Sequence, residues 1–488
     1  MFGALFRMRQ PMEDPPECDE DMKTIESLIS MKVVPPLDSS FRPAVLWNQA
    51  FREAVRSSGA GEPLILGLER GDGSVSRFET RILSGGHPMA EANLFYVERL
   101  VKSLLWMRGG YKIIVGGPQR IGEHIRRAYS AGGSRTFDVD LMSTAYLKPF
   151  KVVAMDAADV PPARETTRPL GRHLDGCRIG FDLGASDRKV CAVVDGEPVF
   201  SEEVPWDPRP QSDPAYHYHQ IMSGLHQAAS RLPRLDAIGG SAAGIYIDNE
   251  PRVASLFRGI PRDLFRRGVK PMFKRIQKAW RVPVDVVNDG EVTALAGSMS
   301  LNANRVLGIS LGSSQAGGYV NEQGHITAWL NELAFAPVDY RPDAPVDEWS
   351  GDAGCGVQYF SQQAVFRLAA AAGIRLGKKL TAVEKLKAVQ ELLAKGDERA
   401  DRIFATIGCF LGYGIAHYAD FYDIGHVLIL GRVTSGGGGP IILKNARKVL
   451  KKAFPELTPA IELHLPDEKS RRVGQAVAAA SLPVIPKK

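Results

Sequence analysis

The sequence predicts an α/β protein with two similar lobes and an additional α/β region at its N-terminus. From residue 177 onward, glycine-punctuated strands alternate with helical segments. A strand–turn–strand pattern with small residues in its turn occurs at 178–195 and again at 305–320, which indicates a duplicated lobe. The length of 488 residues allows roughly two to four domains of ordinary size.

The composition is that of an ordinary globular protein, with 44% hydrophobic residues and a net charge of +6. This charge is small for the length and gives no reason to expect nucleic acid as a partner. No apolar run is long enough to span a membrane, and the first residues lack the apolar core of a signal peptide. The five cysteines are scattered without a C-x-x-C pair. A cytoplasmic protein without a membrane partner is therefore expected.

Shifts in composition divide the chain into five parts. Residues 1–60 are expected to form a partly irregular arm, 61–160 an accessory α/β unit and 161–176 a proline-containing linker. The first lobe is predicted over 177–303 and the second over 304–488. The last helix is expected to pack back on the first lobe.

The accessory unit is predicted from its alternating patterns. A β-hairpin is expected over 64–82, with Gly71-Asp-Gly in its turn. Helical periodicity follows over 90–107, then a strand over 111–115 and a helix over 121–129. A further strand is expected over 146–155.

The two lobes have their own predicted elements. First-lobe strands are expected at 178–182, 190–195, 198–204, 235–239, 243–247 and 284–287, and helices at 214–231, 261–280 and 290–299. Second-lobe strands are expected at 305–311, 317–320 and 427–430, and helices at about 358–376 and at 383–395, 400–422, 440–453 and 468–480.

The first hairpin carries the sequence Asp182-Leu-Gly-Ala-Ser-Asp-Arg-Lys189 in its turn. Gly180 and Gly184 allow a close approach of the backbone to a ligand. The amides of such a turn can hold phosphate oxygens, and Asp182 supplies a hard oxygen beside them for Mg²⁺. The hairpin resembles the first phosphate loop of the actin–hexokinase–Hsp70 superfold.

The second hairpin has only small residues from Gly312 to Gly318, apart from Gln315. Its backbone amides and the hydroxyls of Ser313 and Ser314 could hold a γ-phosphate from the other side of a cleft. A plain hairpin with a Ser/Gly turn is the alternative.

A buried strand ends at Asn288-Asp289, immediately before a helix. Ligand-binding groups of α/β sheets lie at such strand ends. Asp289 could accept the proton of a substrate hydroxyl, and Asn288 could hydrogen-bond neighbouring hydroxyls. Alternatively, Asp289 caps the helix, and capping does not exclude catalysis.

Two further patterns each have an alternative interpretation. The strand over 427–430 ends in Gly431, and the glycines from Gly436 to Gly439 precede a helix, so this segment could lie against an adenosine or form a flexible loop. His217-Tyr-His219 has the spacing of a two-ligand metal pair but lies on a predicted helix without a third ligand, which favours a surface role.

The order of these motifs resembles the ROK family of bacterial sugar kinases and sugar-responsive repressors, over residues 177 to about 480. The resemblance implies an actin-like ATPase (ribonuclease H-like) fold and a homodimer. The implied ATP-binding residues are Gly184, Ala185, Ser186, Lys189, Gly312, Ser313, Ser314, Gly431 and Gly436, with Asp182 holding Mg²⁺ through water. The implied substrate-binding residues are Ser241, Gly244, Asn288, Asp289 and Glu332, with Asp289 as the catalytic base.

The sequence departs from the family pattern around the sugar site. Glu332 keeps its place, but Phe335 stands where the family has a zinc-binding histidine, and Val357 replaces a sugar-contacting glutamate. Cys355 is the only thiolate left in the zinc loop, and one thiolate cannot complete a tetrahedral site, so no structural zinc is expected. Phe335 and Val357 are expected to make the pocket less polar.

The sequence thus predicts ATP- and Mg²⁺-dependent phosphorylation of a hydroxyl on a sugar or a sugar-like polyol, as in glucokinases. Residues 1–175 show no clear helix-turn-helix, which argues against a DNA-binding repressor. The alternative is a non-catalytic sugar-binding or regulatory protein on the same fold. The altered pocket motifs favour that alternative, whereas the presence of both Asp182 and Asp289 favours the kinase.

Overall fold

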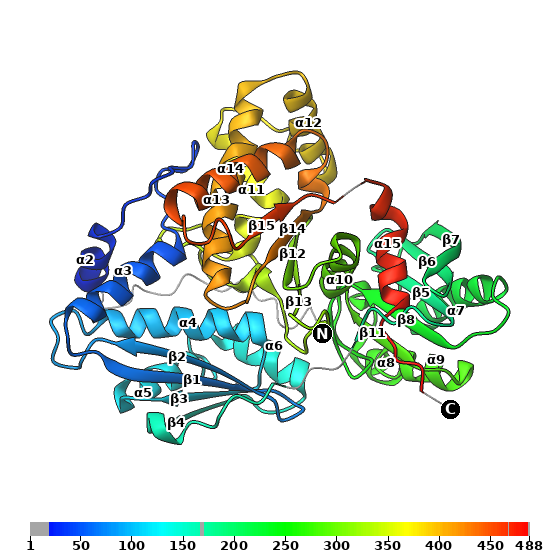
Figure 1. Ribbon diagram of the computed structural model, residues 1–488, viewed down its shortest axis with the longest axis horizontal. Helices are drawn as coiled ribbons and strands as arrows, with labels where there is room; N and C mark the ends of the chain where they lie inside the picture. The colour runs from blue at the N-terminus through cyan, green and yellow to red at the C-terminus, as the bar shows by residue number, and fades with distance from the viewer. Residues whose placement is uncertain (1–18, 166–169, 467, 487–488) are drawn as a thin grey trace.

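The computed structural model describes residues 19–165, 170–466 and 468–486. The expected N-terminal arm and linker therefore lie partly outside the described residues. The chain is a mixed α/β protein in which three larger sheets each have their own group of helices (Figure 1).

The first lobe is built on a five-stranded sheet with the order β11-β8-β5-β6-β7. Its strands are β5 (Cys177–Leu183), β6 (Asp187–Val194), β7 (Glu197–Pro205), β8 (Ala237–Ala242) and β11 (Val284–Asn288). β5, β6 and β7 form an antiparallel meander, and β8 and β11 run parallel to β5. This is the strand order of a ribonuclease H-like fold.

The other elements of the first lobe surround this sheet. They are α7 (Pro214–Ala229), the ribbon of β9 (Ile245–Ile247) and β10 (Glu250–Val253), α8 (Arg262–Leu264), α9 (Met272–Trp280) and α10 (Asp289–Leu301). The apolar side of α9 buries Phe273 against Phe181 of β5, with ring centroids 6.1 Å apart.

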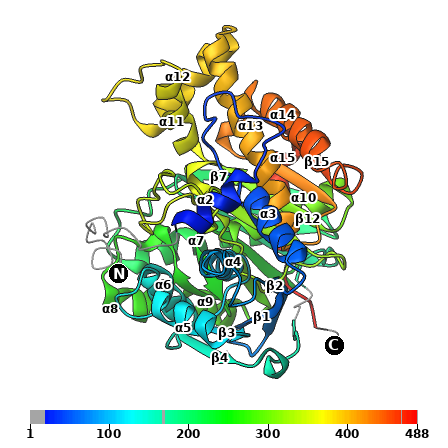
Figure 2. The same ribbon diagram turned by 90° about the vertical axis from the view of Figure 1, so that its left-hand side faces the viewer.

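The second lobe repeats the plan with four strands in the order β13-β12-β14-β15. An antiparallel hairpin joins β12 (Val306–Leu311) to β13 (Gln315–Val320), and β14 (His426–Leu430) and β15 (Glu462–His464) run parallel to β12. The two lobes therefore share the actin-like arrangement. The second-lobe helices rise above this sheet (Figure 2): α11 (Gln362–Ala371), α12 (Ala382–Ala394), α13 (Glu398–Ala419) and α14 (Gly438–Ala453).

The accessory region has a four-stranded sheet with the order β2-β1-β3-β4. Its elements are α2 (Asp19–Ser27), α3 (Ala44–Ser57), β1 (Glu62–Glu69), β2 (Val75–Ile82), α4 (Ala92–Arg108), β3 (Lys112–Gly116), α5 (Gln119–Ala128), α6 (Thr136–Tyr146) and β4 (Lys151–Met155). Almost every side chain of α4 is buried, including those of Glu98, Arg99 and Lys102, because the helix lies between its own sheet and the second lobe.

A single apolar core joins the accessory region to the second lobe. Trp47 of α3 lies 5.8 Å from Tyr340, and Phe41 lies 4.7 Å from Phe410 of α13, measured between ring centroids. The first lobe has a separate core. The accessory region is therefore packed as part of the second lobe.

The last helix, α15 (Glu468–Ala480), crosses from the second lobe and packs on the sheet of the first (Figure 1). Glycines permit this close approach. A Cβ at Gly180 would lie 1.8 Å from the carbonyl oxygen of Ala476, and one at Gly239 would lie 1.6 Å from that of Ala479. Any larger residue at these positions would displace α15.

Two sequence expectations about local structure are wrong. The strand expected over 146–155 begins only at Lys151, because α6 continues to Tyr146 and Pro149, which lacks an amide donor, follows it. The single helix expected over 261–280 is interrupted before α9, where Pro271 precedes its first residue.

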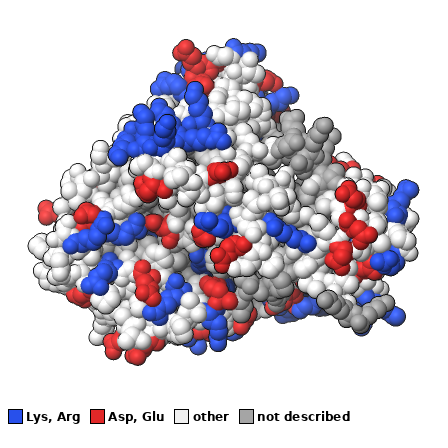
Figure 3. All heavy atoms as spheres, viewed as in Figure 1, with Lys and Arg blue, Asp and Glu red and all other residues white. Residues whose placement is uncertain are grey.

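Lysine and arginine side chains gather over α14 (Figure 3). The exposed members are Lys444, Arg447, Lys448, Lys451 and Lys452. The opposite side of the same helix is buried, so this basic stripe is the solvated face of an amphipathic helix. None of the described helices has the length and apolar character that crossing a membrane requires.

A buried network of ion pairs fastens the segment around Asp352 to α4 and α6. The Asp352 carboxylate lies 3.1 Å from Lys102 Nζ, 3.4 Å from Arg99 Nη1 and 2.7 Å from Arg135 Nη1. Burial alone would raise the pKa of Asp352, but Arg99 and Lys102 outweigh burial, and its pKa is lowered. The ionised carboxylate is thus the native form at neutral pH.

We expect Asp352→Ala to destabilise the protein by about 3–5 kcal/mol, because buried cations lose a shared counter-ion. The effect should shrink as the pH falls below the ordinary carboxyl pKa, since the stability supplied by a lowered carboxyl pKa is lost in acid. Urea unfolding at pH 7 measures it. Asp343→Ala is the control, because the Asp343 side chain is 83% exposed and should change stability by less than about 0.5 kcal/mol. Equal effects of the two substitutions would contradict this role for Asp352.

Candidate active site

The junction of β11 and α10 places Asp289 at the first turn of a helix. Asn288 is the N-cap residue: its Oδ1 accepts a hydrogen bond from the amide of Gly290 at 2.7 Å. Its Nδ2 donates to the carbonyl oxygen of Gly244 at 2.8 Å. Asn288 therefore performs the capping that had been considered for Asp289, and both of its polar groups hold the backbone. The Asp289 side chain makes one short contact, with the amide of Gly290 at 3.0 Å.

The start of α10 lies directly against β13 of the second lobe. A Cβ at Gly290 would lie 2.2 Å from the carbonyl oxygen of Gly317, and one at Gly318 would lie 2.1 Å from that of Gly290. Only glycine permits this contact between two backbones. Since β13 begins at Gln315, immediately after the second small-residue turn, Asp289 is held near that turn.

Asp182 lies at the end of β5, just before the first small-residue turn. It is only 6% exposed, and Ser241 Oγ of β8 donates a hydrogen bond to its Oδ1 at 2.6 Å. Ser241 had been expected to bind substrate. It is completely buried and orients Asp182 instead.

The first turn itself exposes Ala185 and Ser186. The amide of Gly184 donates to the carbonyl oxygen of Asp187 at 3.0 Å, and Lys189 Nζ lies 3.5 Å from Asp187 Oδ1. Lys189 is thus engaged by a neighbouring carboxylate at the edge of the turn. The indole of Trp206 donates to the carbonyl oxygen of Gly184 at 2.9 Å and steadies the loop.

The second turn exposes Ser313 and Ser314. The amide of Gly312 donates to the carbonyl oxygen of Ser314 at 3.0 Å, and the carbonyl oxygen of Gly312 accepts from the amide of Gln362 at the start of α11 at 2.9 Å. Both small-residue turns are therefore anchored by backbone hydrogen bonds, while their tips remain accessible.

Gly431 ends β14 beside this second turn. Its φ of 101° and the 2.4 Å between a hypothetical Cβ and the carbonyl oxygen of Leu311 both require glycine. Gly436 also has a positive φ, of 64°, but it is exposed and nothing lies within 4 Å of its hypothetical Cβ. Gly431 thus joins the end of β14 to the second turn, and Gly436 lies in an open loop before α14.

Asp182 and Asp289 are two neighbouring acidic side chains, and both have a raised pKa. Burial raises the pKa of Asp182. Burial and the neighbouring Asp182 raise the pKa of Asp289 to about 6. Asp182 lies on β5 and Asp289 begins α10 directly after β11 of the same sheet, and the two carboxylates are close enough to interact, so a cation between them would relieve both.

Two glutamates extend this acidic group. Burial and then Asp289 raise the pKa of Glu332 to about 7. Burial raises the pKa of Glu291 to about 8, and Glu332 adds to the effect. Sequence analysis had assigned no role to Glu291. Its position three residues after the Asn288 cap was the available signal, but that spacing is common to helix starts.

A pocket of about 260 Å³ opens beside these residues. The first lobe contributes Gly244, Tyr246, Asn288 and Glu291, and the second contributes Glu332. The accessory region also contributes to the wall. Arg70, Gly71 and Asp72 come from the β1–β2 turn. Tyr146 is the last residue of α6, and Lys148 follows it. Asp289 is half-buried and adjoins the pocket through Glu332.

The end of α4 holds the loop that carries Glu332. The amides of Leu330, Asn331 and Glu332 donate to the carbonyl oxygens of Arg108, Met107 and Trp106 at 3.3, 3.0 and 3.0 Å. These carbonyls are among the last four of the helix, which have no partner within it. The accessory region thus fixes a pocket residue that lies far away in the sequence.

The expectation that Phe335 and Val357 make the pocket less polar is wrong. Phe335 packs on Trp106 and Phe137 of the accessory helices, at centroid distances of 4.3 and 5.6 Å. Val357 is buried with Ala334 and Cys355. Neither side chain is in the wall of the pocket. Phe335 thus adds to the apolar contact with the accessory region, and Val357 packs beside it.

The expected surface role of the His217-Tyr-His219 pair is wrong for His217. It is completely buried, and its Nε2 lies 3.0 and 3.2 Å from the carbonyl oxygens of Pro208 and Leu256. His219 is exposed. The two rings therefore face different surroundings, and His217 serves the packing of the first lobe.

No family model and no curated protein matches this chain. Several solved structures are similar in backbone. A ROK family glucokinase from Streptomyces griseus, in complex with glucose and AMPPNP, is 19% identical with a TM-score of 0.47, over 62% of this chain and 98% of that one. A ROK hexokinase from Thermus thermophilus is 20% identical with a TM-score of 0.49, over 62% and 96%.

A ROK family transcriptional regulator, homologous to the Mlc protein of Escherichia coli, is 17% identical with a TM-score of 0.49, over 63% of this chain and 79% of that one. Kinases and a regulator are thus both similar to this chain. Identities of 17–20% and TM-scores of 0.47–0.49 are too low to show a family or an activity for this chain. The fold is established by the strand orders of the two lobes.

We expect Glu291→Gln to raise the melting temperature at pH 9 but to leave it nearly unchanged at pH 5. The raised pKa of Glu291 means that the native state holds its proton more tightly than the unfolded state does. Stability therefore falls as the pH rises from the ordinary carboxyl value through about 8. The amide keeps the size and cannot ionise, and the gain at pH 9 should be on the order of a few kcal/mol. Thermal melting of both proteins at the two pH values measures it. A gain of equal size at pH 5 and pH 9 would rule out this ionisation as the cause.

Proposed function

We propose that this protein phosphorylates a hydroxyl group of a sugar or a sugar-like polyol, with ATP as the phosphoryl donor. One observation carries the proposal. Asp182 and Asp289 are neighbouring carboxylates, one preceding the first small-residue turn and the other packed beside the strand that follows the second. The motif resemblance described under Sequence analysis implies the same assignment.

In this proposal the two turns bind the phosphates of ATP. Gly184, Ala185 and Ser186 would do so from the first lobe, and Gly312, Ser313 and Ser314 from the second, through amides and hydroxyls. Gly431 and Gly436 would lie along the adenosine. Lys189 would offset phosphate charge after exchanging its contact with Asp187 for the nucleotide.

Asp289 would act as the general base. It takes the proton of the acceptor hydroxyl while that oxygen forms a bond to the γ-phosphorus and the bond from this phosphorus to the bridging oxygen of ADP breaks. ADP then leaves. A pKa of about 6 suits this role, because the carboxylate is ionised at neutral pH and is still basic enough to accept a proton. Positioning by the turns supplies most of the remaining catalysis, because the transition state of phosphoryl transfer is loose.

Mg²⁺ fits the residues around Asp182. Ser241 occupies Oδ1 of this buried carboxylate, which leaves Oδ2 for a bound water, and the ion prefers a few carboxylate contacts completed by water and phosphate oxygens. When bound, Mg²⁺ would offset the charge of the β- and γ-phosphates. The charge shared between Asp182 and Asp289 favours a cation at this place.

The acceptor would occupy the 260 Å³ pocket. Glu332 and Glu291 would supply polar contacts from the lobes, and Tyr146 and Lys148 would supply them from the accessory region. Asp289 would reach the acceptor from beside Glu332. We infer that the accessory region helps to choose the acceptor and to keep water, a competing nucleophile, away from the phosphate.

A sugar-binding protein without catalysis is the second candidate. It is favoured by the lining of the pocket, which contains Glu332 but not Asp289. A coupled assay of ADP release across a panel of sugars and cyclitols separates the two candidates. If a compound raises the melting temperature while none stimulates turnover, the binding function is correct.

Asp289→Asn should reduce kcat by about 10²- to 10⁴-fold, because the amide cannot accept the hydroxyl proton. The affinity for ATP should stay within about twofold. In the unsubstituted protein, kcat/KM for the acceptor should fall as the pH drops below about 6, since the protonated carboxyl is inactive. Asp263→Asn is the matched control, because the Asp263 side chain is 71% exposed on the surface of the first lobe. Retention of turnover by Asp289→Asn would remove the assignment of the base.

Lys148→Ala tests the part of the accessory region in acceptor binding. Loss of one hydrogen-bonding group should raise KM for the acceptor roughly three- to tenfold, with kcat nearly unchanged. Lys148 is exposed, so the fold should tolerate the change. Lys151→Ala is the control, because Lys151 is an exposed residue of the neighbouring strand β4 that does not line the pocket. An unchanged KM would indicate that the accessory region covers the pocket without touching the acceptor.

A further inference from the structure

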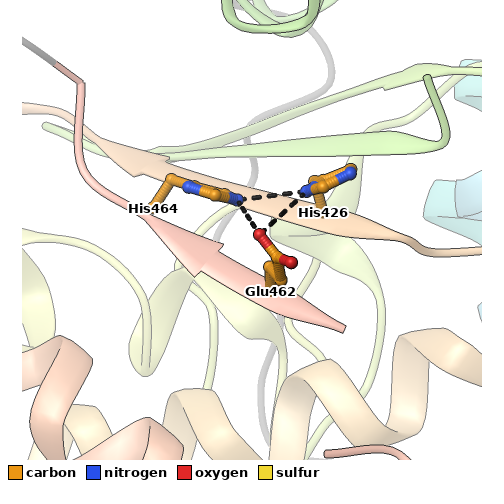
Figure 4. A group of neighbouring side chains, drawn as sticks. All are labelled: His426, Glu462 and His464. Carbon is orange, nitrogen blue, oxygen red and sulfur yellow. Dashed lines mark hydrogen bonds and ion pairs between the residues drawn. The ribbon is translucent and has the colours of Figure 1, made fainter. Parts of the chain in front are cut away.

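A group of three potential metal ligands lies at the edge of the second-lobe sheet, away from the candidate active site. His426 is the first residue of β14, and Glu462 and His464 belong to the three-residue edge strand β15 (Figure 4). Among the described residues, no other group of three histidine, cysteine or acidic side chains brings its ligand atoms as close together.

The register of the two strands explains this convergence. β14 and β15 are parallel, and His426 pairs with Glu462 while Leu428 pairs with His464. Paired residues of adjacent strands, and residues two apart on one strand, point to the same face of a sheet. The three side chains therefore share one face, and Figure 4 shows both rings and the carboxylate turned toward a common point.

The distances suit a common ion. His426 Nδ1 lies 3.1 Å from His464 Nε2, and Glu462 Oε2 lies 3.8 and 3.6 Å from these two atoms. The point in the plane of these three atoms that is equidistant from them lies roughly 2.0 Å from each. This is the length of a zinc–imidazole or zinc–carboxylate bond. The carboxylate is too far from both rings for hydrogen bonds, so its direction is not explained by hydrogen bonding alone.

The surroundings permit binding. The histidine side chains are 27% and 23% exposed, and that of Glu462 is 69% exposed, so an ion can enter from solvent and keep a water ligand. The guanidinium of Arg447 is held within the protein, because its Nη2 donates to the carbonyl oxygen of Leu463 at 2.7 Å.

We propose that His426, Glu462 and His464 form a site for a divalent transition-metal ion such as Zn²⁺. Two imidazoles and a carboxylate are a ligand set typical of zinc, and the ion would complete its coordination with water. Mg²⁺ prefers oxygen ligands and would not compete.

The bound ion would fasten β15 to β14. β15 is joined to the sheet by a ladder of only three residue pairs, and it is the last strand before α15, which packs on the first lobe. The ion would therefore stabilise β15, after which the chain passes from the second lobe to the first. This site neither uses nor depends on the proposed kinase residues.

The experiment measures Zn²⁺ binding by isothermal titration calorimetry on the untagged, nucleotide-free full chain in the presence of Mg²⁺. All proteins carry Cys18→Ser, because Cys18 lies outside the described residues and a thiol could capture zinc. We expect one site per chain in the parent protein, a rise in melting temperature with Zn²⁺, and visible Co²⁺ absorption bands typical of low-symmetry nitrogen and oxygen coordination.

His464→Gln and His426→Gln should each weaken Zn²⁺ binding at least about tenfold and remove the thermal shift. The matched control, His219→Gln, changes an exposed histidine of α7 and should bind as the parent does. Equal melting temperatures in EDTA would show that the variants fold. If the parent binds no zinc at one equivalent per chain, or if both glutamine variants bind as tightly as the parent, the site does not exist and the three side chains are only a polar cluster.

Discussion

The close packing of α10 against β13 is the contact on which the candidate site depends. Gly290 and Gly318 remove the side chains that would otherwise separate the two backbones, so the helix from one lobe begins beside the hairpin of the other. Asp289 therefore lies near both small-residue turns at once: it is the first residue of that helix, and it interacts with Asp182 at the end of β5. A side chain at either glycine would move the carboxylate relative to both turns.

The placement of Asp289 also brings several acidic side chains close together. Four acidic groups meet in a partly buried space, and burial together with mutual repulsion raises the pKa of Asp289, Glu291 and Glu332. Such a concentration of acidic groups lowers the stability of the folded protein, as is typical of sites that bind cations or transfer protons. In contrast, the acidic group around Asp352 is matched by buried arginines and a lysine, and it holds the accessory region in place. The same residue type thus serves binding in one place and architecture in another, according to its partners.

The sequence predicted the positions of most strands and long helices of the two lobes, because each hairpin, each strand end and each long helix has a local pattern. The assignment of Asp182, Gly184, Asn288 and Asp289 to a site rests on the same local patterns and stays a prediction. What the sequence missed depends on contacts between distant residues. Phe335 was assigned to the pocket, but the apolar surface of Trp106 and Phe137 attracts it elsewhere. Ser241 was assigned to the substrate, although its neighbour across the sheet is Asp182. His426 and His464 belong to different strands, so their spacing in the sequence carried no signal.

The carbonyl groups at the end of α4 have a consequence for how the chain matures. During synthesis α4 leaves the ribosome long before residues 330–332 exist, and its last carbonyls then have only water as a partner. Trp47 and the apolar side of α4 likewise lack Tyr340 and Phe335, which cover them in the finished protein. We therefore expect that the N-terminal third does not become native as a separate, excisable module. Its core, which it shares with the later half, and the wall of the pocket would be completed only when the nascent polypeptide is nearly finished.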